Sequence, residues 1–81
     1  MSSVDLALYG VVRIARLLRQ PNDYDGWGLN KRSPQIGDTG YVVEILQASG
    51  LPNNYVVECS GSDGTTLWLG EFLAEELGAV S

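Results

Sequence analysis

The tetrapeptide YVVE occurs at residues 41–44 and again at residues 55–58, and this repeated stretch decides the fold. Successive side chains of a β-strand point to opposite faces of its sheet. Because a glutamate is rarely buried without a partner, we expect Glu44 and Glu58 to face solvent. The alternate positions are then assigned to the core, and they are Tyr41, Val43, Ile45, Tyr55, Val57 and Cys59. The repeat therefore predicts two antiparallel neighbours that share one in/out pattern, without a duplicated functional motif.

Turn residues bound these two strands on both sides. The turn Gly37-Asp38-Thr39-Gly40 leads into the first strand, which we expect at residues 41–47. The second strand is expected at residues 55–60. Asp63-Gly64 then predicts a type I′ hairpin turn, because that turn favours residues that accept positive φ angles. A third short strand, TLWL, is expected at residues 66–69.

The two ends of the chain are less regular. Residues 11–18, VVRIARLL, suit a strand because Val11, Val12 and Ile14 are β-branched. The same segment also carries apolar residues at helical spacing, so a helix remains the alternative. The all-β character of the downstream chain favours the strand. Residues 73–77 suit a single helical or 3₁₀ turn ended by Gly78, followed by a short closing strand at residues 79–80.

A long connection spans residues 19–37 and contains two prolines and three glycines. A loop of this length in so small a chain is either functional or flexible. We expect Tyr24 and Trp27 to pin it to the body of the protein. The alternation also leaves Val42 and Val56 on the outer face of their strands, so we expect this loop, or another subunit, to cover part of that face.

Length and composition indicate a small globular protein. The 81 residues suffice for one domain, residues 1–81, with a modest core. Its apolar fraction of 44% is typical of a folded chain. The single cysteine cannot form an internal disulfide. No apolar run approaches the roughly 20 residues that span a bilayer, and the N-terminus has no signal-peptide pattern, so we expect a cytoplasmic protein.

Charge is unevenly distributed along the chain. The net charge is −5, all five basic residues lie within the first 32 positions, and seven acids follow them. An acidic balance argues against binding nucleic acid, where Lys and Arg supply most of the affinity, and against an anionic membrane surface. It is compatible with a basic protein partner. The alternative is that the charge serves only solubility.

Four segments carry a family resemblance: VVRIARLL, GDTGYVVEIL, YVVEC and DGTTLWLGEFLAEEL. They resemble a bacterial family of small SH3-like barrel proteins of unknown function, over roughly residues 11–80 but without the insertion at residues 22–35. The resemblance implies an all-β, single SH3-like five-stranded barrel with a long first loop and a 3₁₀ turn before the last strand. Small proteins of this kind often travel on mobile or accessory genes.

A looser likeness is to the barrel of the plasmid-borne type II dihydrofolate reductase. The catalytic strand of that enzyme carries Val-Gln-Ile-Tyr, which would fall on residues 66–69 of this chain. The sequence there is TLWL, so the glutamine and the tyrosine are both missing. The likeness therefore concerns shape alone, and the activity is not carried over.

The usual signatures of catalysis are absent from the sequence. There is no histidine, so Cys59 has no imidazole to activate it, and we expect a buried structural thiol. Asp23 and Asp25 do not fit a calcium loop and are expected to initiate turns. Glu75 and Glu76 are expected to be solvated on a short turn. We therefore predict no catalytic residue, no metal site and no cofactor.

The strongest surface signal is aromatic. An exposed Tyr/Trp cluster rimmed by acids would form a protein-binding patch, and the residues expected there are Asp23, Tyr24, Asp25, Trp27, Trp68 and Glu71. The alternative is that Trp27 and Trp68 only fill the core and pin the loop. The sequence thus favours a non-enzymatic binding or accessory module for protein–protein interaction or self-association, with a homo-oligomer plausible. The competing hypothesis is an oligomeric ligand binder or enzyme whose site, at a symmetric pore between subunits, is lined by Trp68, Glu44 and Glu58.

Overall fold

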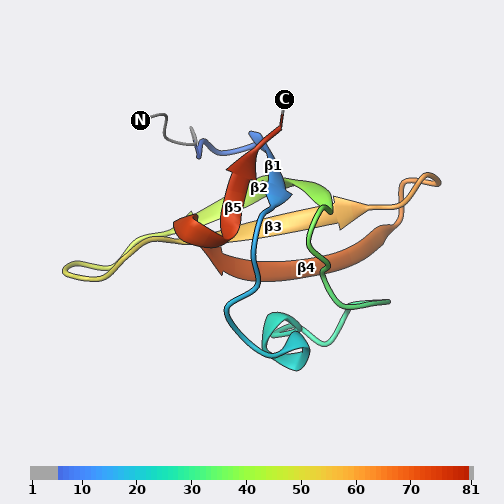
Figure 1. Cartoon of the computed structure of the whole chain (residues 1–81), viewed down its shortest axis with the longest axis horizontal. Coiled ribbons are helices and arrows are strands. Elements are labelled where there is room, and N and C mark those ends of the chain that lie inside the picture. The colour runs from blue at the N-terminus through green and yellow to red at the C-terminus, as the bar shows by residue number, and fades with distance from the viewer. Residues whose placement is uncertain (1–5, 81) are drawn as a thin grey trace.

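The computed structural model describes residues 6–80 and contains β-strands and 3₁₀ turns but no α-helix in that range (Figure 1). Its elements are β1 (Val11–Ile14), η1 (Pro21–Tyr24), β2 (Thr39–Leu46), β3 (Asn54–Ser60), β4 (Thr66–Leu73), η2 (Ala74–Glu76) and β5 (Leu77–Ala79). The all-β prediction is confirmed. The start of the N-terminus, on which the signal-peptide expectation depends, lies outside the described residues.

The five strands form one antiparallel sheet in the order β4-β3-β2-β1-β5. The first and last strands in this order, β4 and β5, each pair on one side only, so the sheet does not close into the predicted barrel. Figure 1 shows β1 and β5 running across β2, β3 and β4. The core lies where these two groups of strands pack against each other.

The two YVVE copies are paired neighbours, as predicted, but they do not share one in/out pattern. Tyr55, Val57 and Cys59 of β3 are buried as expected. In β2 the assignment was wrong, because Val42 is fully buried while Tyr41 is 37% exposed. A β-bulge between Val42 and Glu44 explains the difference. The extra residue reverses the alternation, so that Val42 before the bulge and Ile45 after it both reach the core.

The expected strand at residues 11–18 is confirmed only for β1, and the helical alternative is excluded. β1 ends at Ile14 because the next two amides bond elsewhere: the N–H groups of Ala15 and Arg16 donate to the carbonyl oxygen of Glu76, at 2.8 and 3.2 Å. The 3₁₀ turn predicted near the C-terminus is also present. The closing strand, however, begins at Leu77, so Gly78 lies within β5 rather than ending the turn.

The Asp63-Gly64 hairpin forms, but its turn is not type I′. Only Gly64 has a positive φ, +85°, and its N–H donates to the Gly61 carbonyl at 3.0 Å. The Asp63 carboxylate accepts from the N–H of Thr65 at 3.1 Å. Because this side chain already closes the turn, Asp63 need not adopt the left-handed backbone that a type I′ turn demands.

Aromatic side chains from distant segments meet in the core. The ring of Tyr24, from the long loop, stacks on Phe72 of β4 with a centroid distance of 5.0 Å. Trp68 packs against the same Phe72 ring at 5.6 Å. Tyr24 thus pins the loop to the sheet, as predicted. Trp27 is not part of this buried cluster and is 45% exposed.

Candidate functional site

The predicted aromatic cluster does not form as an exposed patch. Tyr24 and Trp68 are buried, and only Trp27 reaches solvent. Trp68 is 0% exposed, and its indole Nε1–H donates to Asp38 Oδ2 at 2.9 Å. The alternative, in which Trp68 fills the core, is therefore the observed arrangement for this residue.

The acids assigned to the rim of that cluster do not surround an exposed aromatic patch. Asp25 Oδ1 accepts from the N–H groups of Leu29 and Asn30 at 3.0 and 3.2 Å, and Asp23 Oδ2 accepts from the Gln20 N–H at 3.3 Å. Both aspartates thus shape turns of the loop, the structural role expected of them. Glu71 lies on β4, next to Val56 of β3, and its backbone carbonyl accepts from the Arg19 guanidinium of the loop.

The long loop covers the free edge of β4. This strand pairs only with β3, so its other edge would leave backbone groups open to pairing with another chain. The Lys31 N–H donates to the Leu67 carbonyl at 2.8 Å, and the Leu69 N–H donates to Asn30 Oδ1 at 2.9 Å. The Arg19 guanidinium donates to the carbonyl of Glu71. These three contacts fall on alternate residues of β4, so the loop provides hydrogen-bond partners for the backbone groups at the free edge of the strand.

A buried glutamate completes this edge. Glu76 is 0% exposed, so the expectation that it is solvated was wrong, whereas Glu75 is exposed as expected. Its carboxylate accepts from the N–H groups of Leu73 at 2.9 Å and Leu18 at 3.1 Å, and from the Tyr24 hydroxyl. Burial, and then the hydrogen bond to Glu76, raises the pKa of the Tyr24 hydroxyl. Glu76 therefore joins β4, the loop and η1 at one point.

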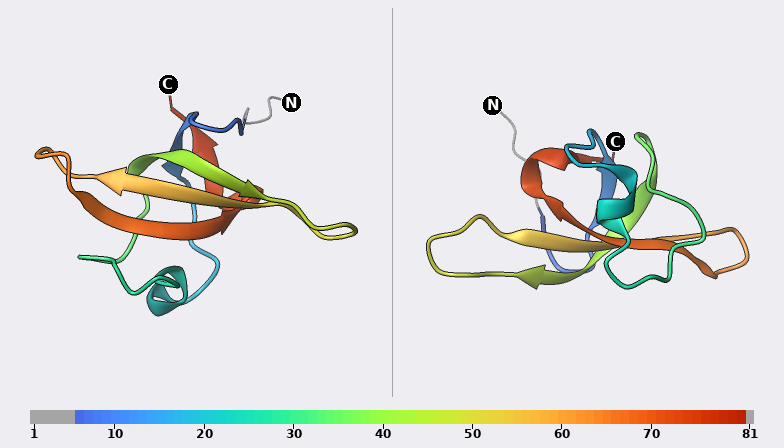
Figure 2. Two further views of the ribbon diagram at one scale, coloured as in Figure 1. Left: turned by 180° about the vertical axis from the view of Figure 1, so that it is seen from behind. Right: turned by 90° about the horizontal axis from the view of Figure 1, so that it is seen from below.

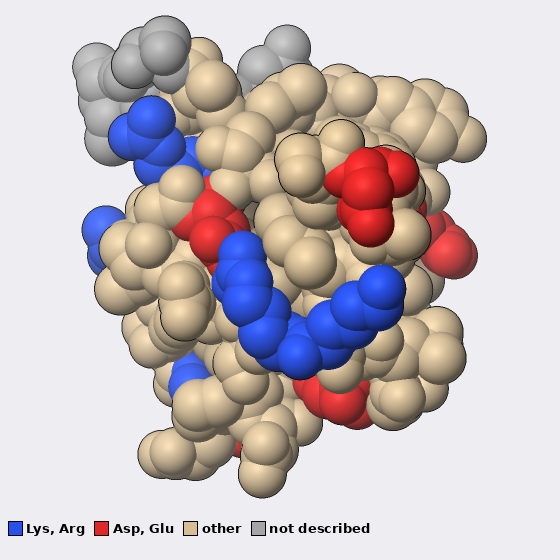
Figure 3. Space-filling model, turned by 90° about the vertical axis from the view of Figure 1, so that its right-hand side faces the viewer, with Lys and Arg blue, Asp and Glu red and all other residues tan. Residues whose placement is uncertain are grey.

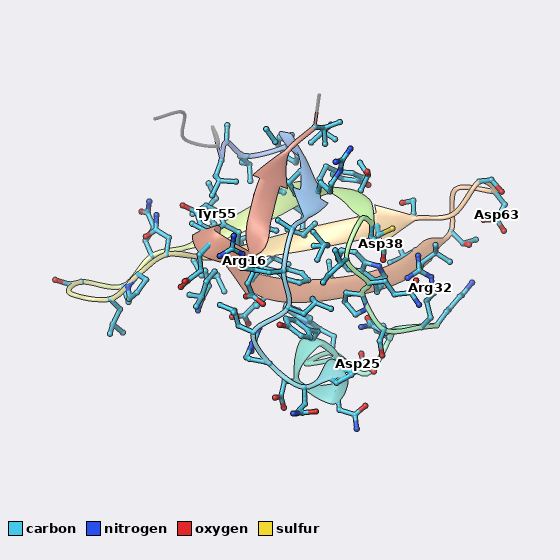
Figure 4. All side chains as sticks on the ribbon, viewed as in Figure 1. Arg16, Asp25, Arg32, Asp38, Tyr55 and Asp63 are labelled. Atoms are coloured by element: carbon cyan, nitrogen blue, oxygen red, sulfur yellow. The ribbon has the colours of Figure 1, made fainter. Side chains whose placement is uncertain are left out.

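A second polar cluster fixes the start of β2. Both guanidinium NH2 groups of Arg32 donate to the Asp38 carboxylate, at 2.8 and 3.1 Å, and the Gln35 N–H donates at 2.9 Å (Figure 4). Burial alone would raise the pKa of the Asp38 carboxyl, but the hydrogen bonds from Arg32, Gln35 and Trp68 outweigh it and hold that pKa below its usual value. On this side of the molecule, acidic and basic side chains are intermixed (Figure 3).

The Asp38 cluster gives a pH-dependent prediction. An aspartate whose pKa is lower in the folded state stabilises the fold above its unfolded pKa of about 3.9, and this contribution disappears as the pH falls through the folded value. We expect Asp38→Asn to lower the free energy of unfolding by about 1–2 kcal/mol at pH 7. The difference between wild type and variant should stay constant from pH 7 to about pH 5 and shrink below about pH 4. Urea unfolding across this pH range measures the difference in the free energy of unfolding. A difference that grows on acidification would contradict the claim that the cluster stabilises ionised Asp38.

Two observations concern metal binding and the reactivity of the cysteine. Within residues 6–80, no group of three His, Cys, Asp or Glu side chains is placed to hold a metal ion. Cys59 is buried on β3 as predicted, and burial, followed by the negative charge of Asp38, raises the pKa of its thiol. A raised thiol pKa leaves little thiolate at neutral pH, which is the reverse of what a nucleophile needs.

We therefore expect Cys59 to be unreactive in the native state. At pH 8, modification by a disulfide reagent such as DTNB should be at least about 100-fold slower in buffer than in denaturant, because both thiolate formation and access require opening of the sheet. The release of thionitrobenzoate gives the rate directly. Rapid native labelling would place this thiol at the surface.

The surface that the structure does present is the outer face of β2, β3 and β4. Seen from behind, these strands face the viewer and no other segment crosses in front of them (Figure 2, left). Directly paired residues share a face, so the register defines three rows across the strands. The rows are Leu46-Asn54-Leu73, Glu44-Val56-Glu71 and Tyr41-Glu58-Leu69. We refer to these nine residues as the outer face.

An apolar groove continues the first of these rows. It has a volume of about 310 Å³ and lies at the base of the β2–β3 hairpin, which projects from the body of the molecule (Figure 2, right). Its lining residues are Leu46, Gln47, Ala48, Leu51, Pro52, Asn54 and Leu73. Leu51, in the hairpin loop, is 66% exposed. Nothing in the sequence marks this groove, because it depends on how the hairpin projects beyond the sheet.

The long loop, one of the two covers expected for the outer face, does not lie over it. The long loop lies along the edge of β4 instead, and Val42 points to the core because of the bulge. Val56 remains on the outer face but is only 4% exposed, with Glu44 and Glu71 as its direct cross-strand neighbours. Its burial therefore requires no additional subunit.

Comparisons of the chain with known protein families, with curated proteins and with solved structures found no match. Between residues 6 and 80, no helix has the length and apolar character needed to cross a bilayer.

Proposed function

We propose that the protein is a non-enzymatic binding module that recognises another protein through its outer face and the adjoining groove. The observation that carries this proposal is the open apolar groove beside the uncovered strands. Aliphatic side chains that are exposed together in a concave site lose water when a partner side chain enters, which favours association. A small accessory or adaptor role fits a chain of this size.

Recognition through the face is favoured over pairing at the sheet edge. The loop and Glu76 already satisfy backbone groups of β4 from Leu67 to Leu73, so an incoming strand would have to displace them. The other end of the sheet is the three-residue β5, which offers only a short edge. The groove needs no such displacement before a ligand can enter.

Site-specific photo-crosslinking tests the proposal. A benzophenone amino acid at Ala48, in the groove, should give discrete adducts in the native cells, whereas the same group at the exposed Ser62, in the β3–β4 hairpin, should not. Adding Leu51→Ser to the Ala48 probe should remove the adducts without unfolding the protein, since surface substitutions usually change stability by less than about 0.5 kcal/mol. Equal labelling from both positions, or none from Ala48, would contradict the proposal.

The pore hypothesis receives less support. It requires Trp68 to line a cavity shared between subunits, but this side chain is wholly buried within the protomer. Glu44 and Glu58 do lie on the outer face, yet Glu58 is already engaged by the hydroxyls of Tyr41 and Thr66. A binding face explains the exposed residues without a symmetric pore.

We also propose that the architecture belongs to the SH3-like class. In support, the order of elements is a short strand, a long loop, three strands joined by hairpins, a 3₁₀ turn and a short last strand. The crossing of β1 and β5 over the other strands is compatible with that class. An experimental structure in which β1 and β5 stacked parallel to β2–β4, without crossing them, would rule it out.

A further inference from the structure

The groove and the acids of the outer face form one surface. Glu44 lies two residues before Leu46 on β2, and Glu71 lies two residues before Leu73 on β4. Both glutamates are direct cross-strand neighbours of Val56. Because neighbouring strands are about 4.8 Å apart, the two carboxylate-bearing residues flank the centre of the face at a separation of roughly 10 Å.

Neither of these two carboxylates forms an ion pair with a described residue. The one ion pair found between residues 6 and 80 joins Arg32 to Asp38, elsewhere in the molecule. The three strands of the outer face lie entirely within residues 39–73, and the chain has no Lys or Arg after residue 32. Arg19 donates to the backbone carbonyl of Glu71 and lies 4.5 Å from the ring centroid of Tyr24, but it forms no ion pair with either glutamate. The field over the face is therefore negative.

Resting on the proposed function, we propose that the occupant is a cationic protein segment that carries an apolar anchor. Its anchor, an aliphatic or aromatic side chain, fills the groove, and an Arg or Lys lies over Val56 between Glu44 and Glu71. The Leu46 and Glu44 rows are two residues apart, or about 7 Å along a strand. An extended segment spans the same distance when its apolar and basic residues are separated by one position.

A second copy of this chain fits the face less well. A two-fold symmetric contact brings the same surface of both copies together. It would place Glu44, Glu58 and Glu71 of one copy against the same residues of the other. Like charges in contact disfavour such pairing, and the net charge of −5 on each chain adds to the repulsion. Charge complementarity therefore selects a basic partner.

Titration with a defined peptide, followed by ¹⁵N–¹H NMR, tests this inference. The probe is the acetylated and amidated peptide Arg-Thr-Leu-Thr-Arg-Thr-Leu-Thr-Arg, which repeats the expected spacing. We expect amide shifts to concentrate at Leu46, Ala48, Leu51 and Leu73. A control peptide with Glu in place of every Arg, and another with Ser in place of every Leu, should each bind at least tenfold more weakly. Shifts that concentrate on β1 or β5 would overturn the inference.

Variants separate this inference from the proposed function. The double variant Glu44→Gln/Glu71→Gln should bind the probe peptide about three- to thirtyfold more weakly than wild type. Added salt should also weaken binding of the peptide to the wild-type protein. Leu51→Ser should weaken binding of the probe peptide by more than about tenfold. If only Leu51→Ser has an effect, the groove binds but the cationic preference is wrong. If neither has an effect, the proposed function fails at this face. The same amides can also be followed in the wild-type protein without peptide as the protein concentration is raised. Shifts like those caused by the peptide would then identify a second copy as the occupant and overturn the inference.

Discussion

Replacing Glu76 with alanine should cost about 3–5 kcal/mol of the free energy of unfolding. The substitution leaves the N–H groups of Leu18 and Leu73 and the hydroxyl of Tyr24 without their acceptor. Each buried donor left unsatisfied costs about 1–3 kcal/mol. A chain of this size has a total stability of roughly 4–12 kcal/mol, so the variant should be partly or wholly unfolded at 37 °C. Urea unfolding monitored by circular dichroism measures the loss.

The neighbouring glutamate provides the matched control. Glu75 is exposed in the same 3₁₀ turn, so Glu75→Ala should change stability by less than about 0.5 kcal/mol. Tyr24→Phe removes only one of the three donors and should cost about 1–2 kcal/mol. Equal effects of Glu75→Ala and Glu76→Ala would show that Glu76 is not the buried junction described above.

The two tryptophans should differ just as sharply. Trp68→Ala should lower the free energy of unfolding by about 3–5 kcal/mol, because it opens a large cavity beside Phe72 and removes a hydrogen bond to Asp38. Trp27→Ala, at an exposed loop position, should cost less than about 0.5 kcal/mol. Chemical denaturation of both variants provides the comparison.

Fluorescence gives an independent control when the variant Trp68→Ala does not fold. In Trp27→Phe the only remaining indole is Trp68, and its emission should be blue-shifted and resistant to iodide quenching. In wild type, the Trp27 contribution should be quenched readily. If iodide quenched the indole of Trp27→Phe as strongly as free tryptophan, Trp68 would have to lie at the surface.

Strand pairing could be predicted from the sequence, but the phase of β2 could not. The two YVVE stretches share letters because both belong to neighbouring strands of one sheet. Local alternation assigned Tyr41 to the core because nothing in the letters marks the bulge after Val42. A bulge forms where it improves packing of the whole strand, and here it brings both Val42 and Ile45 to the core. That choice depends on long-range packing.

The role of Glu76 also lay beyond local reasoning. Short turns with adjacent glutamates are usually solvated, and nothing in the sequence distinguishes Glu76 from Glu75. Their difference arises because Leu18 and Tyr24, more than fifty positions away, supply donors to one of the two side chains. In the same way, nothing in the sequence marks Asn30, although its side-chain oxygen accepts a hydrogen bond from the Leu69 N–H of β4.

The sequence indicated an exposed aromatic patch around the long loop, whereas the candidate surface lies on β2, β3 and β4. Of the six residues expected in that patch, Glu71 also belongs to the outer face. The aromatic residues were misplaced because a core this small takes up its large side chains, and Trp68 and Tyr24 are among its largest members. Of the three aromatic residues expected in the patch, only Trp27 is exposed.

Recognition through the outer face depends most on the sealed edge of β4. Amide hydrogen exchange measures this directly at Leu69 and Leu73, whose N–H groups point away from β3 toward Asn30 and Glu76. We predict that both amides are protected at least about 100-fold in wild type. In Asn30→Ala, protection should be lost at Leu69 but kept at Leu73. Exchange of both amides at the rate of an unstructured peptide in the folded wild-type protein would contradict the account, since β4 would then present an open edge.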